Sequence, residues 1–146
     1  MTQDQNSLPR RQAREIAFQF LYGSLPAPQK ESGVSPALFS HTEFELFCIN
    51  FVHKMDEFAW ELIEGTGKNL PSLDETIAKV SAHWRIERMP RVDLTIARLG
   101  GFEILFRPDI PKTVAINEAV ELAKRYGAED SAAFINGILD KFTKPA

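Results

Sequence analysis

Apolar side chains recur along this chain with a period close to 3.6 residues, and no run alternates between apolar and polar positions as a half-buried β-strand does. The pattern predicts an all-α protein of about seven helices. Proline and glycine, which disfavour helix interiors, mark most of the breaks between them. The expected helices span about residues 7–22, 42–54, 56–66, 72–84, 91–106, 112–126 and 129–142.

Two of the expected helices begin with the residues of a capping box, in which a hydroxyl side chain and an acid three residues later satisfy each other's backbone amides. Thr42 with Glu45 matches this pattern, and so does Ser72 with Glu75. We therefore expect helices to start at Thr42 and at Ser72.

The segment 65–71 contains two glycines and a proline. It is expected to end one helix and to separate two packed helical subdomains, residues 1–69 and 70–146. Gly65-Thr66-Gly67-Lys68 superficially resembles a phosphate-binding loop, but it lacks the P-loop spacing and a preceding strand. A helix terminator is the better interpretation.

Composition indicates one folded domain with its charge divided between regions. The 146 residues carry a net charge of −3, and the segment 43–64 holds six acidic side chains and one lysine, so the rest of the chain is slightly basic. The single cysteine excludes an internal disulfide. With no apolar stretch at the N-terminus to act as a secretory signal, the expected location is the cytoplasm.

The first expected helix carries the strongest signal for a ligand. Projected on a helical wheel, a core stripe of small and apolar residues lies roughly opposite a stripe of arginines that leads into two aromatic residues. Arginine pairs with phosphate, and aromatic rings stack on unpaired bases, so this stripe favours RNA binding. The alternative is an ordinary solvated face with aromatics buried against another subdomain. The stripe consists of Arg10, Arg11, Arg14, Phe18 and Tyr22.

No combination of residues indicates catalysis, a cofactor site or a metal site. His41, Cys48 and His53 match no common zinc spacing, so a core thiol with surface histidines is the preferred interpretation. Gly100-Gly101 lies within an expected helix, where it does not predict dinucleotide binding, although a glycine pair permits a close helix–helix approach. We expect a protein that is not an enzyme.

Three blocks of the sequence resemble the NusB family. The run KTVAINEAVELAKRYGAEDSAAFINGILDKF at 112–142 is similar to the family's C-terminal signature. RRQAREIAFQFLY at 10–22 resembles its arginine-rich first helix, and HWRIERMPRVDLTIARLGGFEIL at 83–105 resembles its central helix. The blocks occur in family order.

The resemblance implies two helical bundles, no enzymatic activity and a role in bacterial transcription antitermination. Family members pair with a small-subunit ribosomal protein, NusE, and bind single-stranded boxA RNA, which helps RNA polymerase to read through terminators, notably in rRNA operons. Other Nus factors and RNA polymerase are implied as indirect partners, and a homodimer is a further expectation. The acidic segment 43–64 is expected to face away from RNA or toward a basic protein partner.

The resemblance also assigns roles to residues. Arg10, Arg11 and Arg14 match RNA-binding arginines, and Phe18 lies on the same stripe. Tyr22 matches a tyrosine near the RNA and partner surface; we place it, with the acidic Asp93, on the side of the protein partner.

Asp130 and Phe134 match a second RNA-proximal patch at the start of the last helix. Phe134 either stacks on a base or packs half-buried. Asp130 either accepts a hydrogen bond from a base amino group or is a first-turn acid favoured by the helix dipole.

Two alternative functions remain at this stage. The chain is either a NusB-like RNA-binding domain associated with an rRNA methyltransferase, which would need a fused α/β cofactor domain, or a helical bundle for protein interaction whose basic stripe is only solvated surface.

Overall fold

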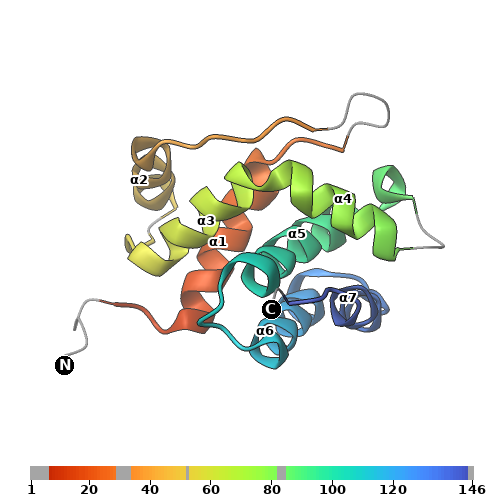
Figure 1. Ribbon diagram of the computed structural model, residues 1–146. Coiled ribbons are helices and arrows are strands. Elements are labelled where there is room, and N and C mark those ends of the chain that lie inside the picture. Colours follow the sequence, from red (N-terminus) through yellow and green to blue (C-terminus); the bar gives the residue numbers. More distant parts are fainter. Residues whose placement is uncertain (1–6, 29–33, 52, 82–84, 145–146) are drawn as a thin grey trace.

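The computed structural model describes residues 7–28, 34–51, 53–81 and 85–144. Within these residues the protein has seven α-helices and one 3-10 turn, with no strand (Figure 1), which confirms the all-α prediction. The α-helices are α1 Arg10–Ser24, α2 His41–Asn50, α3 Glu57–Lys68, α4 Leu70–Val80, α5 Arg91–Phe106, α6 Lys112–Tyr126 and α7 Ser131–Asp140, and the 3-10 turn η1 is Ile86–Arg88.

The predictions for α5 and α6 are confirmed at both ends. The start of each helix follows from the proline that stands immediately before it. Pro90 and Pro111 occupy the cap positions and have no amide hydrogen to leave unpaired. The seventh helix is shorter than predicted, and η1 was not predicted. The expected C-terminal residue of the fourth helix, Trp84, lies outside the described residues.

Both predicted capping boxes are wrong. The box of α2 is formed two residues earlier, where the Ser40 hydroxyl accepts from the Glu43 amide and the Glu43 carboxylate accepts from the Ser40 amide. Ser72 lies inside α4, which follows Asn69 directly. Pro71 in the first turn of α4 starts this helix earlier than the serine does.

The two glycines predicted to end a helix lie inside α3 instead. A Cβ atom at Gly65 would overlap the ring of Phe102, and one at Gly67 would overlap the carbonyl oxygen of Ala37. The Ala37 amide also donates to the Gly67 carbonyl at 2.9 Å, which fixes the extended segment that crosses back over α3 toward α2 (Figure 1). The glycines therefore serve close packing.

Helix α5 lies at the centre of the molecule and packs against α1, α3, α4, α6 and α7. Every residue from 93 to 104 is buried, including three charged side chains. Arg98 donates two hydrogen bonds of 2.7 Å to Asp74 of α4 and one of 2.9 Å to the Pro26 carbonyl. Since α5 contacts helices on both sides of residue 70, the division into two subdomains stays a prediction.

The glycine pair of α5 has a packing role. A Cβ atom at Gly100 would lie 2.7 Å from Leu139 Cδ1, and one at Gly101 would lie 2.6 Å from Phe142 Cε2. These distances are below normal van der Waals contact, so only glycine lets α7 and the residues after it approach α5 so closely.

Helices α6 and α7 form a hairpin that is tied at both ends. At the turn, the Ser131 hydroxyl accepts from the Ala128 amide at 2.9 Å. At the open end, Lys112 at the start of α6 donates to the Asp140 carbonyl at the end of α7 at 2.7 Å.

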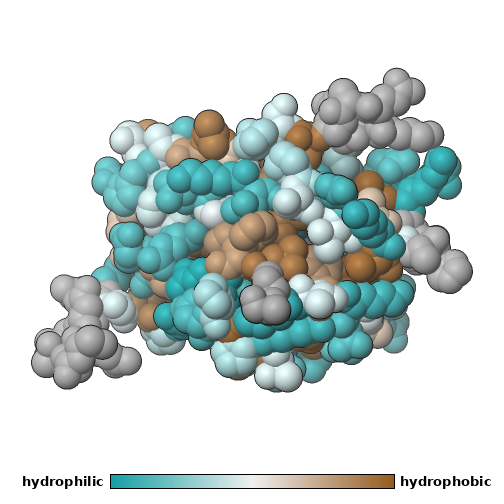
Figure 2. Space-filling view, in the orientation of Figure 1, coloured by the Kyte–Doolittle hydropathy of each residue, from teal (hydrophilic) through white to brown (hydrophobic). Residues whose placement is uncertain are grey.

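The surface is mainly hydrophilic in the view of Figure 2, with an apolar patch near the end of α5, whose last residue, Phe106, is exposed. Among the described residues, no helix combines the length and apolar character needed to span a bilayer.

We predict that Gly101→Ala lowers the free energy of unfolding by about 1–3 kcal/mol, because the added methyl group overfills the contact with Phe142. Urea denaturation measures this change. Gly137→Ala in α7 is the matched control, since its Cβ atom meets nothing within 4 Å, and it should stabilise by up to about 1 kcal/mol. Equal effects of the two substitutions would contradict the close-packing explanation.

Candidate nucleic-acid interface

The first turn of α1 presents cations without any acidic residue or side-chain cap. Arg10, the first helical residue, is exposed, and its guanidinium lies 4.2 Å from the ring centroid of Phe58 in α3. The guanidinium groups of Arg14 and Arg107 also lie over this ring, each at 5.3 Å. Phe58, which the sequence analysis did not single out, thus supports Arg10 at the surface.

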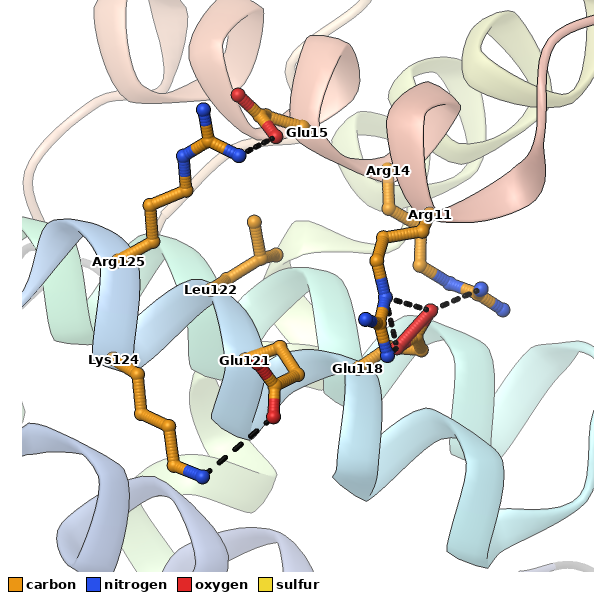
Figure 3. Close-up of a pocket in the computed structure, with 8 residues that line it drawn as sticks. All are labelled: Arg11, Arg14, Glu15, Glu118, Glu121, Leu122, Lys124 and Arg125. Atoms are coloured by element: carbon orange, nitrogen blue, oxygen red, sulfur yellow. Dashed lines mark hydrogen bonds and ion pairs between the residues drawn. The ribbon is translucent and has the colours of Figure 1, made fainter.

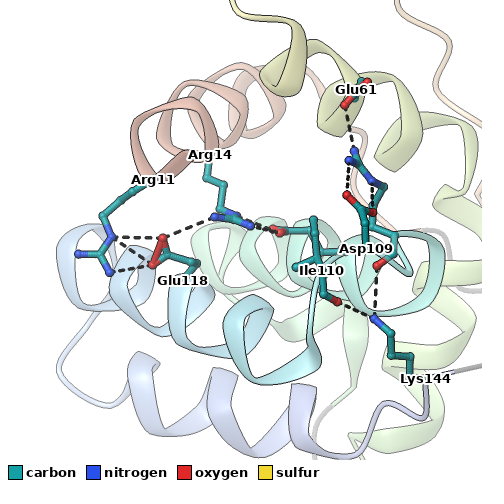
Figure 4. Close-up of polar contacts among 9 residues, drawn as sticks. Arg11, Arg14, Glu61, Asp109, Ile110, Glu118 and Lys144 are labelled. Carbon is teal, nitrogen blue, oxygen red and sulfur yellow. Dashed lines mark hydrogen bonds and ion pairs between the residues drawn. The ribbon is translucent and has the colours of Figure 1, made fainter. Parts of the chain in front are cut away.

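Arg11 is also exposed, but a carboxylate holds it in place. Its Nε lies 3.1 Å and its Nη2 2.8 Å from Oε2 of Glu118 in α6, while 69% of its side chain remains exposed (Figure 4). The hydrogen bond and the charge of Glu118 raise the pKa of Arg11.

Arg14 is buried, so the prediction that it lies on an exposed stripe is wrong. Only 4% of it is exposed; its Nη2 lies 2.7 Å from Oε1 of Glu103, and its Nη1 lies 3.5 Å from Glu118. Burial raises the pKa of Glu103, although Arg14 opposes that shift. Because α1 packs on α3 and α5 and is also joined to α6, a wheel with one buried face could not place Arg14.

Phe18 is buried as well, with 3% exposed, and the prediction of an exposed stacking ring is wrong for it. Its ring packs 4.9 Å from that of Tyr126 in α6. Tyr22, one turn further, is exposed, and the guanidinium of Arg91 lies 5.0 Å from its ring centroid. The aromatic end of the predicted stripe is therefore reduced to Tyr22.

A groove of about 270 Å³ runs between α1 and α6 and joins these cations to others (Figure 3). Arg125 Nη1 lies 2.9 Å from Glu15 Oε2, and the Tyr126 hydroxyl donates to Glu15 Oε1 at 2.6 Å. Lys124, which is exposed, approaches Glu121 at 3.6 Å. The groove therefore combines exposed cations with carboxylates that neutralise them.

The sequence analysis missed Glu118, Lys124 and Arg125 as members of this surface. The signal for Glu118 and Arg125 was present in the block at 112–142, where Glu118, Glu121 and Arg125 follow one another at intervals of three and four residues and so share one helix face.

The second predicted patch lies at the start of α7. Asp130 is exposed in the cap position and makes no side-chain cap hydrogen bond. Phe134 is half-buried and packs against the core. The start of α7 lies close to the start of α5, whose first residue, Arg91, contacts Tyr22. The exposed arginines therefore lie at the start of α1, and the patch of Asp130 and Phe134 lies near its other end.

Asp93 is buried, which contradicts its placement on a surface for the protein partner. It accepts a 2.7 Å hydrogen bond from the Ser131 hydroxyl and so joins α5 to α7. Burial raises the pKa of Asp93, the hydrogen bond from Ser131 opposes that shift, and the charge of Asp130 adds to it.

The three residues considered as metal ligands, His41, Cys48 and His53, have different surroundings and different partners. Cys48 is buried, as predicted, and burial raises the pKa of its thiol. His41 contacts Glu45 at 3.2 Å, and His53 contacts the Gln19 amide oxygen at 2.9 Å. Within the described residues no group of three potential metal ligands is found.

Comparison with known proteins gives a consistent match over nearly the whole chain. The model of the NusB family matches residues 11–144. The transcription antitermination protein NusB of Geobacter sp. strain M21 is 47% identical over 133 residues, which cover 90% of this chain and 92% of that protein. The protein of the same name from Desulfovibrio desulfuricans is 42% identical over 142 residues, covering 92% and 84%.

Solved structures agree. T. maritima NusB aligns with a TM-score of 0.73 at 32% identity, covering 93% of this chain and 91% of that chain. A crystal structure of the antitermination factors NusB and NusE in complex with dsRNA aligns with a TM-score of 0.72 at 25% identity, covering 91% and 94%.

We predict that Arg14→Ala lowers the free energy of unfolding by about 3–5 kcal/mol, because it leaves the Glu103 carboxylate buried without its partner. Chemical denaturation measures the loss. Arg10→Ala, at an exposed position four residues earlier, should change stability by less than about 1 kcal/mol. The double variant Arg14→Met with Glu103→Leu should recover most of the loss, and equal effects of the two single variants would refute the assignment.

The raised pKa of Asp93 predicts that the protein becomes less stable as pH rises. A raised pKa means that the folded state holds the proton of Asp93 more tightly than the unfolded state. The contribution of this proton to the free energy of unfolding is therefore fully present below the ordinary aspartate pKa and is lost as pH rises through the raised pKa. Asp93→Asn should abolish this loss, so the stability of the variant relative to the unmodified protein should increase over that window. Urea titrations across pH measure the difference, with exposed Asp140→Asn as the control; parallel curves for Asp93→Asn and the unmodified protein would contradict it.

Proposed function

Since this chain belongs to the NusB family, we propose that it is a transcription antitermination factor that binds RNA together with a ribosomal protein of the NusE kind. The two relatives described above carry the antitermination name, and one structural neighbour is a complex of NusB and NusE with RNA. We extend the proposal to a boxA-like single strand, and to read-through by RNA polymerase with other Nus factors. A cytoplasmic location accords with this role.

The observation that carries the proposal is the start of α1. Arg10 and Arg11 are exposed in a first turn that has no acidic residue, and no side chain caps its backbone amides. Unpaired amides and the positive end of the helix dipole attract phosphate, and two guanidinium groups at the same place strengthen that attraction. Of the described features, this one combines the most groups suited to a nucleic-acid backbone.

The groove between α1 and α6 gives the RNA backbone a direction. Arg125 and Lys124 continue the positive surface from the start of α1 along α6. Each of these side chains is paired with a carboxylate, which an RNA phosphate would have to displace. We propose that RNA follows this groove from Arg11 toward Arg125 and that its phosphates replace the carboxylates as partners of these cations.

Asp130 and Phe134 remain candidates for a second contact, and Tyr22 for the protein partner. Asp130 is exposed and available to a base amino group. Phe134 offers one partly exposed ring edge at most, since it packs on the core. Arg14, Phe18 and Asp93 are proposed to act indirectly, by holding α1 and α7 in position.

We predict that the double variant Arg10→Ala, Arg11→Ala makes the negative slope of log affinity against log salt shallower by about 1.4. Each lost phosphate contact on a single strand contributes about 0.7 to the magnitude of this slope. Fluorescence anisotropy with a labelled boxA-like RNA measures the slope, with and without the NusE-like partner. Lys79→Ala, an exposed cation on α4, is the matched control and should leave the slope unchanged.

Glu118→Gln should change RNA affinity in the opposite direction in the same titration. It removes the negative charge that holds Arg11, so affinity should rise at low salt. An unchanged slope in the arginine variant would move the RNA path elsewhere. Absence of salt-dependent binding, with or without the partner, would overturn the proposed RNA binding itself.

A further inference from the structure

Exposed apolar side chains gather on α2 and at its C-terminal end. Leu46 is 55% exposed, Ile49 72% and Phe51 63%. A contiguous apolar surface on a folded chain is uncommon unless something covers it, whereas single exposed apolar residues are ordinary. Four other large apolar side chains among the described residues are exposed; Leu38 lies in the segment before α2, and Tyr22, Phe106 and Val114 lie singly on α1, α5 and α6.

The core contacts of α2 hold this surface in a fixed geometry. Phe44 and Cys48 are buried on the inner side, and the rings of Phe44 and Phe47 meet Phe20 of α1 edge to face at 5.8 and 5.4 Å. The capping box at Ser40 fixes the start of the helix. Side chains are thus presented outward from a formed helix, which lowers the entropic cost of binding.

The outward side chains form one face. Leu46 and Ile49 are three residues apart and therefore neighbours on the helix surface, opposite Phe44 and Cys48. Phe51, the residue after α2, does not belong to this face, because its ring packs 4.8 Å from that of Phe47, which contacts Phe20 on the inner side.

Acidic residues border this apolar row. On a helical wheel Glu43 lies on one side of the pair Leu46 and Ile49, and Glu45 lies on the other; both are exposed. Helix α2 contains no lysine or arginine. We call Glu43, Glu45, Leu46 and Ile49 the α2 outer face.

We propose that the α2 outer face docks a basic amphipathic helix of a partner protein. Apolar residues of that helix would cover Leu46 and Ile49, while its lysines or arginines would meet Glu43 and Glu45. The contact spans about two helical turns, so it belongs to the small, transient class of interfaces. This inference is independent of RNA binding at α1.

Charge selects this occupant over the others. Phosphate groups of RNA or of anionic lipids are repelled by Glu43 and Glu45. A second copy of the chain, docked through the same face about a two-fold axis, would bring the glutamates of one copy near those of the other. A basic helix is the partner for which both the apolar row and its acidic borders contribute.

The test uses a synthetic amphipathic peptide of leucine and lysine, about 14 residues long, with leucines at helical spacing. Titrated into the full-length ¹⁵N-labelled protein, it should shift the amide resonances of α2 in a saturable way. Leu46→Ser with Ile49→Ser should weaken binding about tenfold or more, since it removes two apolar contacts. Both residues are exposed, so circular dichroism should show an unchanged fold.

Three controls make the result decisive. Val114→Ser, an exposed apolar residue on α6, should leave peptide affinity unchanged. A leucine–glutamate peptide of the same spacing should bind at least tenfold more weakly, and Glu45→Lys should reduce that preference. The proposal is overturned if the double serine variant binds as the unmodified protein does, if the shifts lie outside α2, if both peptides bind alike, or if sedimentation shows self-association that the double variant abolishes.

Discussion

Burial of α5 on all sides is the constraint on which the rest of the structure depends. A helix buried along twelve consecutive residues carries charge only where its neighbours pair with or hydrogen-bond to it, because a charge left alone in the interior costs several kcal/mol. Three charged residues of α5 are nevertheless inside, and each reaches a different surrounding helix. Asp93 meets Ser131 of α7, Arg98 meets Asp74 of α4, and Glu103 meets Arg14 of α1.

These contacts set the position of α1 and thereby the candidate RNA surface. Arg14 is buried against Glu103, whereas Arg10 and Arg11, one turn earlier on the same side of α1, lie at the helix start and are exposed. Glu118 contacts both Arg11 and Arg14 and joins the interior to the surface. Within a single turn of α1, one arginine thus lies in the core and two lie on the candidate RNA surface.

The sequence predicted well where local signals are strong. Proline before α5 and α6, and the helical period within them, were sufficient for both boundaries. The exposed positions of Arg10, Arg11 and Tyr22 also followed from the pattern. Family resemblance supplied the identity that the pattern alone did not.

Long-range contacts explain what the sequence did not predict. Arg14 is buried because of a carboxylate 89 residues away, and no local pattern reports such a partner. Gly65 and Gly67 looked like a helix end, but they are required by the Phe102 ring and the Ala37 carbonyl, which come from elsewhere in the chain. The exposed pair Leu46 and Ile49 on α2 was not singled out from the sequence.

The two ties of the α6–α7 hairpin bear on how the molecule opens. Ser131 closes the turn by accepting from the Ala128 amide, and Lys112 at the start of α6 donates to the Asp140 carbonyl at the end of α7. Local openings in native proteins follow such linked segments as cooperative units. The hairpin that carries Glu118, Arg125 and Asp130 is thus held at its turn and at its open end, so its two helices are expected to open as one unit.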